Sequence, residues 1–418
     1  MPVKLKTLLP GPKSKKILEK LKRTNGAFNI DQWYVHSGKG KGVYFEDLDG
    51  NTFLDFASQI ATNPLGYNDA ALVKVLQKHS SYTPIKYGGQ DFTVPQHLEL
   101  LEELLKIVPK ELNRAFLSNS GAEANENAIK IAVRHNPRAK LGVSFTNGWH
   151  GRTTGALSMT NAKSVQVKQY LKIPARHLPF NESAAEELEL LIQREFDASE
   201  IGFVIMECVQ GEGGYHVAPK EMVQTIRKTT KKYGIPLIID EVQAGMGITG
   251  KWWAYEHYKV VPDIQTSAKK LQVAATVANH KWWPPERSAI SSTWGGGHVL
   301  DMAMGAAIIR EIKKRKLLHH ATQMGKKTEK WLDDIERHYP LVRNGRGLGL
   351  MRAFDLPSRE LRDQFVQECF KRGLIVLSCG LTGIRVIPSL TVKENELNEG
   401  MHIIADVAKK MGKNHTRR

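Results

Sequence analysis

The chain has 418 residues, of which 41% are hydrophobic and 25% are charged. This composition is typical of a globular protein, and the length is sufficient for about two or three domains. The longest apolar runs, such as residues 201–206, are much shorter than the roughly 18 residues that a membrane-spanning helix needs. The composition therefore argues against a disordered, fibrous or transmembrane chain.

The net charge of +17 taken by itself indicates a polyanion, such as nucleic acid, as a partner. However, residues 1–24 carry eight basic side chains and one acidic one, and residues 409–418 carry five basic side chains. The rest of the chain is therefore nearly balanced, and it shows no interleaved aromatic and basic motif. Polyanion binding through the basic tails is the non-enzyme alternative, and nucleic acid is not the expected partner.

The basic N-terminus is not followed by the apolar segment of a signal peptide, because Pro10 and the lysines after it interrupt the run. We therefore expect an intracellular, cytoplasmic protein that does not associate with membranes. The three cysteines Cys208, Cys369 and Cys379 have no CxxC spacing, which argues against a disulfide framework and a zinc site. We expect them to be small buried side chains, and we expect no metal.

The first predicted element is a β-hairpin over residues 42–57 that turns at Asp49-Gly50. From about residue 114, short apolar strands alternate with helical stretches, which is the order of βαβ units in a mostly parallel sheet. The predicted strands cover 114–118, 141–145, 202–207 and 236–240, and the predicted helices cover 122–134 and 219–233. The sequence therefore predicts a large α/β domain.

After the segment 294–297 the pattern changes to a long helical stretch, roughly 299–335, followed by mixed strands and helices. This pattern is typical of a smaller α+β domain packed on the first. The expected strands are 348–354, 374–378 and 383–387, and the expected helices are 359–371 and 393–410. We predict that residues 61–298 form the large domain, that 299–418 form the small domain, and that the N-terminal segment 1–60 belongs to the small domain.

The segment 118–132 runs from a strand through Ser-Asn-Ser-Gly directly into a helix. The backbone N–H groups after Ser120 and Gly121 then lie free at a helix N-terminus, which suits a phosphate group. A serine that only caps the helix explains the same residues equally well. This segment alone leaves both interpretations open.

A carboxylate and an amine follow two later strands. Asp240 ends the apolar strand 236–240, and Lys269 lies at the end of the next one. Ligands of open α/β sheets bind outside the carboxyl ends of the strands, so both side chains are directed at the expected site. An amine there can form a Schiff base, and a buried carboxylate can keep a pyridine nitrogen protonated. Alone, a helix cap and a surface lysine are the better explanations, but together with the phosphate pocket these residues indicate pyridoxal 5'-phosphate.

Seven ordered segments resemble motifs of the class III aminotransferases of fold type I. They are 118–132 (SNSGAEANENAIKIA), 147–153, 205–214, 237–250, 262–270, 292–297 and 384–390, and the resemblance extends over roughly residues 40–405. It implies a large, mostly parallel α/β domain that binds pyridoxal phosphate, a smaller α+β domain, and a homodimer with shared active sites.

The resemblance also implies the residues of the cofactor site. These are Ser120, Gly121 and Ala122 for the phosphate, Trp149 stacked on the ring, Asp240 for the ring nitrogen, Gln243 for the ring hydroxyl, Lys269 for the Schiff base and proton transfer, and Thr293 for the phosphate in the neighbouring subunit. Three positions depart from the usual pattern: Trp149 stands where Phe or Tyr is commoner, Cys208 replaces a proline, and Lys270 follows Lys269. Spacing alone does not exclude Lys270 as the cofactor lysine.

Arginine binds carboxylates through two parallel hydrogen bonds. By the family pattern, Arg385 would bind the carboxylate of the amino acid and 2-oxoacid, and Arg152 the carboxylate at the other end. Glu212 resembles the family's switch residue, which pairs with Arg385 when a terminal amine is presented and swings away when 2-oxoglutarate binds. Without the resemblance, these three residues would be taken for ordinary surface charges.

Within the family, the stretches 245–264, 268–275, 292–297 and 354–365 are most similar to L-lysine 6-aminotransferases. This similarity implies transfer of the terminal amino group of L-lysine to 2-oxoglutarate, giving L-glutamate and 2-aminoadipate 6-semialdehyde. The alternatives are an ornithine, acetylornithine or 4-aminobutyrate aminotransferase, or a racemase, aminomutase or decarboxylase that uses the same cofactor and fold.

Overall fold

The computed structural model describes residues 2–26, 33–81, 88, 92–290 and 296–415. Its largest sheet has seven strands, in the spatial order β4, β10, β9, β8, β7, β5, β6. In chain order these are β4 (Arg114–Ser118), β5 (Leu141–Phe145), β6 (Ala175–Leu178), β7 (Ile201–Met206), β8 (Leu237–Asp240), β9 (Ile264–Ser267) and β10 (Ala274–Ala278). The neighbouring strands β6, β5, β7, β8 and β9 pair in parallel. In contrast, β10 is antiparallel to both of its neighbours, β4 and β9.

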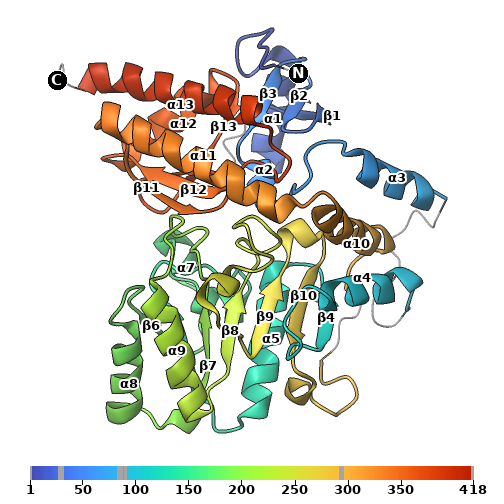
Figure 1. Cartoon of the computed structure of the whole chain (residues 1–418), viewed down its shortest axis with the longest axis vertical. Helices are drawn as coiled ribbons and strands as arrows, with labels where there is room; N and C mark the ends of the chain where they lie inside the picture. Colours follow the sequence, from blue (N-terminus) through green and yellow to red (C-terminus); the bar gives the residue numbers. More distant parts are fainter. Residues whose placement is uncertain (1, 27–32, 82–87, 89–91, 291–295, 416–418) are drawn as a thin grey trace.

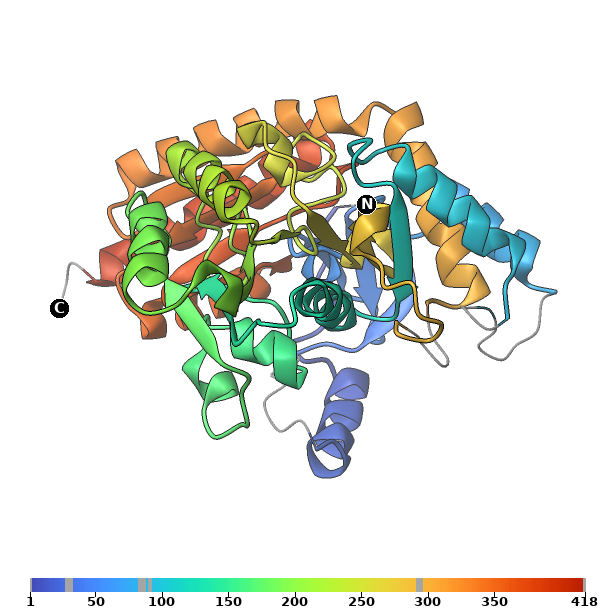
Figure 2. The ribbon, with the colours of Figure 1, turned by 90° about the horizontal axis from the view of Figure 1, so that it is seen from below.

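Helices cover both faces of this sheet. Figure 2 shows α5 (Gly121–His135) and α6 (Thr154–Met159) on one side, and α8 (Ala184–Arg194) and α9 (Lys220–Tyr233) on the other. Every residue of β5, β7 and β8 is buried as a result. Strands covered on both faces are continuously apolar, which explains why the sequence pattern identified them.

Two four-stranded sheets lie together at the other end of the molecule (Figure 1). One contains β1 (His36–Lys41), β2 (Tyr44–Asp47), β3 (Thr52–Asp55) and β13 (Leu374–Ile375). The predicted hairpin is therefore confirmed as β2 and β3, with Gly50 in the turn at a φ of 80°. Because β3 pairs in parallel with β13, the N-terminal segment and the C-terminal part of the chain share a sheet.

The other small sheet has the order β11 (Arg343–Leu348), β12 (Met351–Asp355), β15 (Gly383–Val386), β14 (Leu377–Cys379). The helices α12 (Arg359–Phe370) and α13 (Glu394–His415) belong to the same part of the chain and contact each other. The expected α+β pattern of the C-terminal part is thus present, while the residue boundaries between domains stay a prediction.

The long helical stretch expected over 299–335 is two helices, α10 (Val299–Lys314) and α11 (Leu317–His338). Between them Lys316 has a φ of 53°, in the left-handed region. A residue in this region cannot continue a right-handed helix, so the chain changes direction there. Four consecutive basic residues, 313–316, separate Ile312 from Leu317 at this point, and the prediction of one continuous helix overlooked them.

The remaining helices are α1 (Pro12–Thr24), α2 (Ser58–Ala61), α3 (Ala70–His79), α4 (Pro95–Leu105) and α7 (Ser164–Val167). Much of the basic N-terminal segment lies in α1, which projects from the body of the molecule (Figure 2). In the part of the chain that the structure describes, no helix combines the length and the apolar character that crossing a membrane requires. Cys208, Cys369 and Cys379 are buried free thiols.

Candidate active site

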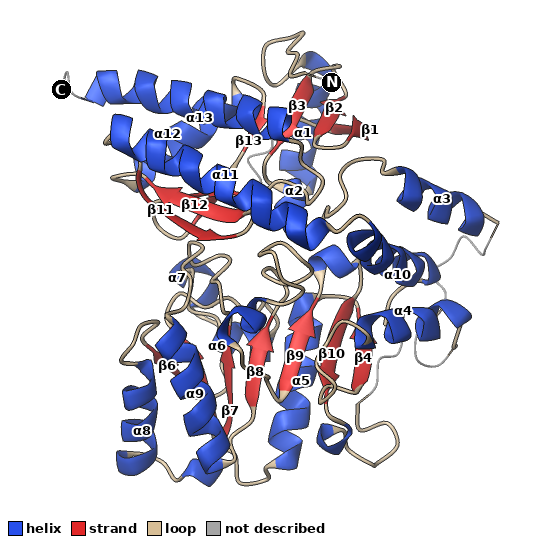
Figure 3. Cartoon of the chain, in the orientation of Figure 1, coloured by secondary structure: helices blue, strands red, loops and turns tan. Residues whose placement is uncertain are grey.

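The arrowheads of β8 and β9 in Figure 3 point towards the part of the molecule that contains β11 and β12. A cavity of about 890 Å³ lies at this end of the sheet. It is lined by every predicted site residue that the structure describes: Ser120, Gly121, Ala122, Trp149, Arg152, Glu212, Asp240, Gln243, Lys269 and Arg385. Thr293 lies outside the described residues. Segments far apart in the chain thus meet where the sequence predicted a site.

The N-terminus of α5 opens into this cavity. Ser120 is its N-cap, and its Oγ accepts a hydrogen bond of 3.2 Å from the backbone N–H of Glu123. The N–H groups of Gly121 and Ala122 belong to the first turn and have no acceptor within the helix. The Ser120 cap uses the N–H group of Glu123, so it does not compete with an anion for the N–H groups of Gly121 and Ala122. Helix capping and anion binding are therefore compatible here.

Glycine at position 121 allows α5 to approach the segments that follow β8 and β9. A Cβ atom added at Gly121 would lie 2.8 Å from Cγ1 of Val242 and 3.5 Å from Cβ of Ala268. The first of these distances is shorter than carbon atoms tolerate, so a side chain here would displace the helix or Val242. The close approach places the N–H groups of the first turn beside Asp240 and Lys269.

Asp240, the last residue of β8, is buried and held by three hydrogen bonds. Its Oδ2 accepts from Asn125 Nδ2 at 2.7 Å and lies 2.9 Å from His150 Nδ1, and its Oδ1 accepts from the Val242 N–H at 2.9 Å. Asn125 is itself fixed by Thr266, whose hydroxyl donates to Asn125 Oδ1 at 2.7 Å. The orientation of the Asp240 carboxylate is therefore determined by α5, β9 and the segment around His150.

No role was predicted from the sequence for Asn125 or His150. A role for Asn125 could have been predicted, because Asn125 lies one helical turn after Gly121. A polar residue on the same face of α5 as Gly121 points to the same end of the sheet. His150 lies within the segment 147–153 that resembles a family motif. However, no pattern in the sequence indicates that its ring contacts Asp240.

Trp149 is half-buried at the cavity wall. Its backbone N–H donates to Glu207 Oε2 at 2.8 Å, and the Gly211 N–H donates to Glu207 Oε1 at 2.9 Å. Burial raises the pKa of Glu207 well above its ordinary value, and the negative charge of Asp240 adds to this increase. Glu207 thus fixes the backbone that carries the Trp149 ring.

Gln243 is buried, and its Oε1 accepts a hydrogen bond of 2.8 Å from the hydroxyl of Tyr215. This bond uses the amide oxygen of Gln243, so the amide nitrogen, which carries the side-chain donors, takes no part in it. Tyr215 was not predicted as a site residue, since nothing in its local sequence relates it to Gln243.

The two lysines of the doublet have different surroundings. Lys269 follows β9 with a φ of 51°, lines the cavity, and donates from Nζ to the carbonyl oxygen of Ile60 at 3.3 Å. Ile60 belongs to α2, a single left-handed turn in which the φ of Ile60 itself is 60°. Lys270 is buried, does not line the cavity, and donates to the carbonyl oxygen of Gln243 at 2.6 Å. Of the two amines, only that of Lys269 faces the cavity.

Burial lowers the pKa of Lys269 to about 8, and the positive charge of Arg385 contributes to this decrease. A considerable fraction of the Lys269 amine is therefore neutral near neutral pH, which a Schiff-base-forming lysine requires. Burial also lowers the pKa of Lys270, to about 7. The pKa values alone do not distinguish the two lysines, but the direction in which the side chains point does.

Glu212 and Arg385 form a buried ion pair in the cavity wall, with 2.7 Å between Arg385 Nη1 and Glu212 Oε1. Burial opposes ionisation of Glu212, but the charges of Arg385 and Lys163 outweigh it and lower the pKa of Glu212 to about 2. The buried Nε of Arg385 has no hydrogen-bond partner among the described residues, so one donor remains for a ligand. Arg152 is exposed where it lines the cavity.

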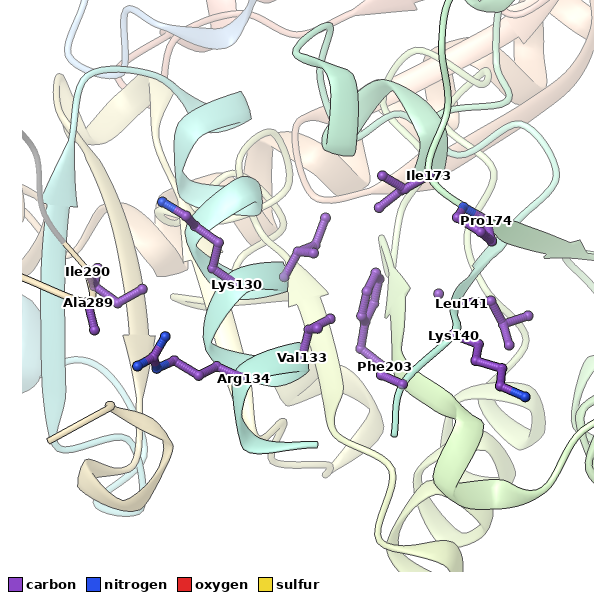
Figure 4. Close-up of a pocket in the computed structure, with 13 residues that line it drawn as sticks. Lys130, Val133, Arg134, Lys140, Leu141, Ile173, Pro174, Phe203, Ala289 and Ile290 are labelled. Carbon is purple, nitrogen blue, oxygen red and sulfur yellow. The ribbon is translucent and has the colours of Figure 1, made fainter. Parts of the chain in front are cut away.

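A second cavity, of about 480 Å³, contains none of the predicted site residues. Figure 4 shows Val133 of α5 between Ile290 on one side and Phe203 and Leu141 on the other. Its lining is mainly apolar, with Lys130, Arg134 and Lys140 among the residues around it. This cavity has no arrangement of acid, amine and helix N-terminus like that of the first.

The larger cavity fits pyridoxal phosphate in three independent respects. It offers first-turn N–H groups that have no acceptor within their helix for a phosphate, a buried and fixed carboxylate for a ring nitrogen, and an amine of lowered pKa for an aldehyde. Among the residues that the structure describes, no three or more His, Cys, Asp or Glu side chains are grouped so as to hold a metal ion.

Comparison with protein families gives a match to aminotransferase class III over residues 26–408. The chain belongs to the class III aminotransferases. It is therefore an enzyme, and pyridoxal 5'-phosphate is its cofactor.

Two relatives illustrate the range of this aminotransferase family. A 4-aminobutyrate aminotransferase of Dictyostelium discoideum is 31% identical, over 98% of this chain and 92% of the relative. An acetylornithine aminotransferase of Archaeoglobus fulgidus is 35% identical, over 88% of this chain and 93% of the relative.

Solved structures confirm the fold of this class III aminotransferase. The lysine aminotransferase of M. tuberculosis, in its internal aldimine form, superposes with a TM-score of 0.87 at 27% identity, over 94% of this chain and 98% of the other. A Bacillus anthracis aminotransferase superposes with a TM-score of 0.85 at 23% identity, over 95% and 99% of the two chains. The predicted fold type I is thereby confirmed.

Proposed function

We propose that this aminotransferase moves the terminal (6-) amino group of L-lysine to 2-oxoglutarate, giving L-glutamate and 2-aminoadipate 6-semialdehyde. The observation that carries the proposal is the buried ion pair between Glu212 and Arg385. While Arg385 is neutralised in this way, the cavity favours an amine end that has no adjacent carboxylate. Lysine presents such an end through its side chain.

Two further observations favour lysine within this class of donors. The stretch 268–275 (AKKLQVAA) contains the lysine doublet followed by Gln-Val that resembles L-lysine 6-aminotransferases. The M. tuberculosis lysine aminotransferase is also similar to this chain over almost its whole length.

A second candidate function is transfer from 4-aminobutyrate or acetylornithine. It is favoured by the relatives of 31% and 35% identity, which are aminotransferases for these donors. Both molecules also present a terminal amine far from a carboxylate, so the pairing of Glu212 with Arg385 does not separate them from lysine.

When bound, pyridoxal phosphate supplies an aldehyde that exchanges amino groups and a ring that withdraws electrons from the reacting carbon. In our proposal Ser120, Gly121 and Ala122 bind its phosphate, and Asp240 holds the ring nitrogen in its protonated form. Trp149 packs against the ring face, and the amide of Gln243 donates to the ring oxygen.

Lys269 has two tasks in this proposal. Its Nζ would hold the aldehyde of the cofactor between turnovers, and the free amine would accept the proton of the carbon next to the donor nitrogen and later give it back. The lowered pKa of Lys269 supports the first half of this transfer, because a neutral amine is needed to accept a proton near neutral pH.

The oxoacid carries a carboxylate next to its reacting carbon. We propose that Glu212 then leaves Arg385, whose guanidinium binds this carboxylate, while Arg152 binds the distal carboxylate of 2-oxoglutarate. The exposed position of Arg152 is compatible with these roles, and so is the Nε of Arg385, which has no partner in the described part of the chain.

We further propose that two copies of the chain form a dimer in which Thr293 completes the phosphate site of the neighbour. The cavity in Figure 4 supports this proposal, because it is lined mainly by apolar side chains and Ile290 at its edge directly precedes the segment 291–295 in the chain.

The proposed function is tested by supplying the purified protein and 2-oxoglutarate with lysine, ornithine, N-acetylornithine or 4-aminobutyrate. Glutamate and the second product are quantified by mass spectrometry, with Lys269→Ala as the inactive control. We expect one glutamate for each donor consumed and the highest kcat/KM for lysine. A higher kcat/KM for another donor would reassign the substrate, and products without glutamate would indicate a racemase, aminomutase or decarboxylase.

A further inference from the structure

Glu212 binds two cations, one on each carboxylate oxygen. Its Oε1 accepts from Arg385 Nη1 at 2.7 Å, and its Oε2 accepts from Lys163 Nζ, also at 2.7 Å. The Arg385 side chain is 6% exposed and the Glu212 side chain 11%, whereas that of Lys163 is 35% exposed. The carboxylate therefore lies between a buried cation and a more accessible one.

Lys163 reaches this position from the N-cap of α7, in a different part of the chain from either partner. It lines the same cavity, and its Nζ lies 5.5 Å from the centroid of the Trp149 ring. A cation over an aromatic face is held there electrostatically. Two separate contacts, to Glu212 and to Trp149, thus fix the amine in the wall of the active site.

A substrate carboxylate that binds Arg385 affects the two ion pairs of Glu212 differently. Glu212 then loses its guanidinium partner, and a carboxylate that is largely removed from water without a cation is strongly disfavoured. The bond to Lys163 involves the other oxygen, so it can persist while Arg385 is engaged elsewhere.

We propose that Lys163 is a positioning residue that stabilises Glu212 after its separation from Arg385, and thereby makes the site accept a 2-oxoacid as readily as a terminal amine. This inference rests on the proposed exchange of Arg385 between Glu212 and a substrate carboxylate. Lys163 acts through Glu212, without itself binding the carboxylate of the oxoacid. Lys163 thereby affects how well the same cavity binds both the amine donor and the 2-oxoacid.

The test measures binding of glutarate, an unreactive dicarboxylate, to the holoenzyme by isothermal titration calorimetry. We expect Lys163→Met to raise the Kd for glutarate about tenfold and Lys163→Arg to restore it to within about threefold, because arginine keeps the charge. The matched control is Lys168→Met, since Lys168 is exposed, close in sequence and absent from the cavity wall. This control should leave the Kd unchanged.

A double-mutant cycle separates an indirect role of Lys163 from a direct one. In the Glu212→Gln background no carboxylate needs a counter-ion, so we expect Lys163→Met to change the Kd for glutarate by less than twofold. An equal effect of Lys163→Met in both backgrounds would overturn the inference, because it would mean that Lys163 binds the ligand directly. No effect in the wild-type background would overturn it as well.

Steady-state kinetics give the second readout. Lys163→Met should raise the KM for 2-oxoglutarate with little change in the KM for the amine donor, whereas a general loss of structure would affect both. An equal increase in both KM values would count against the inference. If the wild-type protein produced no glutamate from any donor, the proposed function itself would fail, and this outcome is distinct from an active enzyme that lacks coupling between Lys163 and Glu212.

Discussion

His150 Nδ1 lies 2.9 Å from Asp240 Oδ2, and both side chains are buried beneath the cavity. An ionised carboxylate can only accept hydrogen bonds, so the ring proton of His150 lies on Nδ1 when Asp240 is ionised. Asn125 binds the same oxygen at 2.7 Å. The carboxylate is thus held in a fixed orientation before any ligand arrives, which is the condition for strong electrostatic stabilisation of a bound cation.

Replacing Asp240 by Asn keeps the shape of the side chain and removes its charge. We expect kcat/KM to fall by about two to three orders of magnitude, because a preorganised charge at a reacting group contributes about that much. His150→Phe leaves the charge in place and removes only one orienting bond, so a smaller loss, about tenfold to a hundredfold, is expected. Steady-state kinetics of both variants provide the test, and equal losses would contradict the assigned roles.

Gly121→Ala tests the close approach of α5 to Val242. The added methyl group would lie 2.8 Å from Val242 Cγ1, and overpacking of this kind costs about 1–3 kcal/mol of unfolding free energy. The Kd for pyridoxal phosphate should also rise, because the first turn of α5 has to move.

The matched control for Gly121→Ala is Gly412→Ala in α13, where an added Cβ meets no atom of the described residues within 4 Å outside the neighbouring helix backbone. This control should stabilise the protein slightly, since alanine favours a helix by about 1 kcal/mol relative to glycine. Urea denaturation and cofactor titration measure both variants. A Gly121→Ala protein with unchanged stability and cofactor affinity would show that the contact has no importance.

The lowered pKa of Lys269 predicts how cofactor-free protein combines with pyridoxal phosphate. Only the neutral amine attacks an aldehyde, so the rate should rise with pH through about 8 and then level off. An ordinary lysine would give a rate that still rises above pH 10. Stopped-flow absorbance between pH 6 and pH 10 would measure this dependence, and a continued rise without a plateau would disagree with the proposed environment of Lys269.

Glu212 should stabilise the folded protein in a pH-dependent way. Its pKa is about 2 in the folded state and near its ordinary value, about 4.5, in the unfolded chain, so the stabilisation is complete above pH 4.5 and is lost as the pH falls towards 2. A difference of this size corresponds to about 3 kcal/mol at pH 7. We therefore expect Glu212→Gln to lower the free energy of unfolding by about this amount at pH 7.

The same stability difference should decrease to less than half at about pH 3, since Glu212 is then almost entirely protonated in the unfolded chain. Denaturation curves of the wild-type protein and the variant at several pH values provide the measurement. A difference that stays constant down to about pH 3 would mean that Glu212 does not stabilise the protein through its charge.

The parts of the fold that local patterns could predict are those in which burial is continuous. The strand β5 occurs at the predicted residues, and the bounds of β7 and β8 lie within one residue of the prediction, because short apolar runs that are buried throughout have few other structures available. The break at Lys316 was missed because lysine and arginine are good helix formers, so the basic run 313–316 did not mark the end of a helix. The pairing of β3 with β13 joins residues more than 300 positions apart, and no local pattern contains that information.

The residues of the site also divide into those that a local sequence pattern could place and those that depend on contacts between distant parts of the chain. The sequence could place Ser120, Asp240 and Lys269 at one end of the sheet because each lies at the end of a strand or shortly after it. His150, Tyr215 and Lys163 were not, since their importance depends on contacts across the fold with partners that the sequence does not specify. The lysine doublet was left ambiguous by spacing, and only the different directions of its two side chains separate Lys269 from Lys270.

The most direct test of the proposed site is identification of the lysine that carries the cofactor. The holoenzyme is reduced with borohydride and digested, and the modified residue is located by mass spectrometry. We predict the phosphopyridoxyl group on Lys269, with the absorbance of the bound cofactor lost in Lys269→Ala and retained in Lys270→Met. Modification of Lys270, or of neither lysine, would contradict the proposed active site.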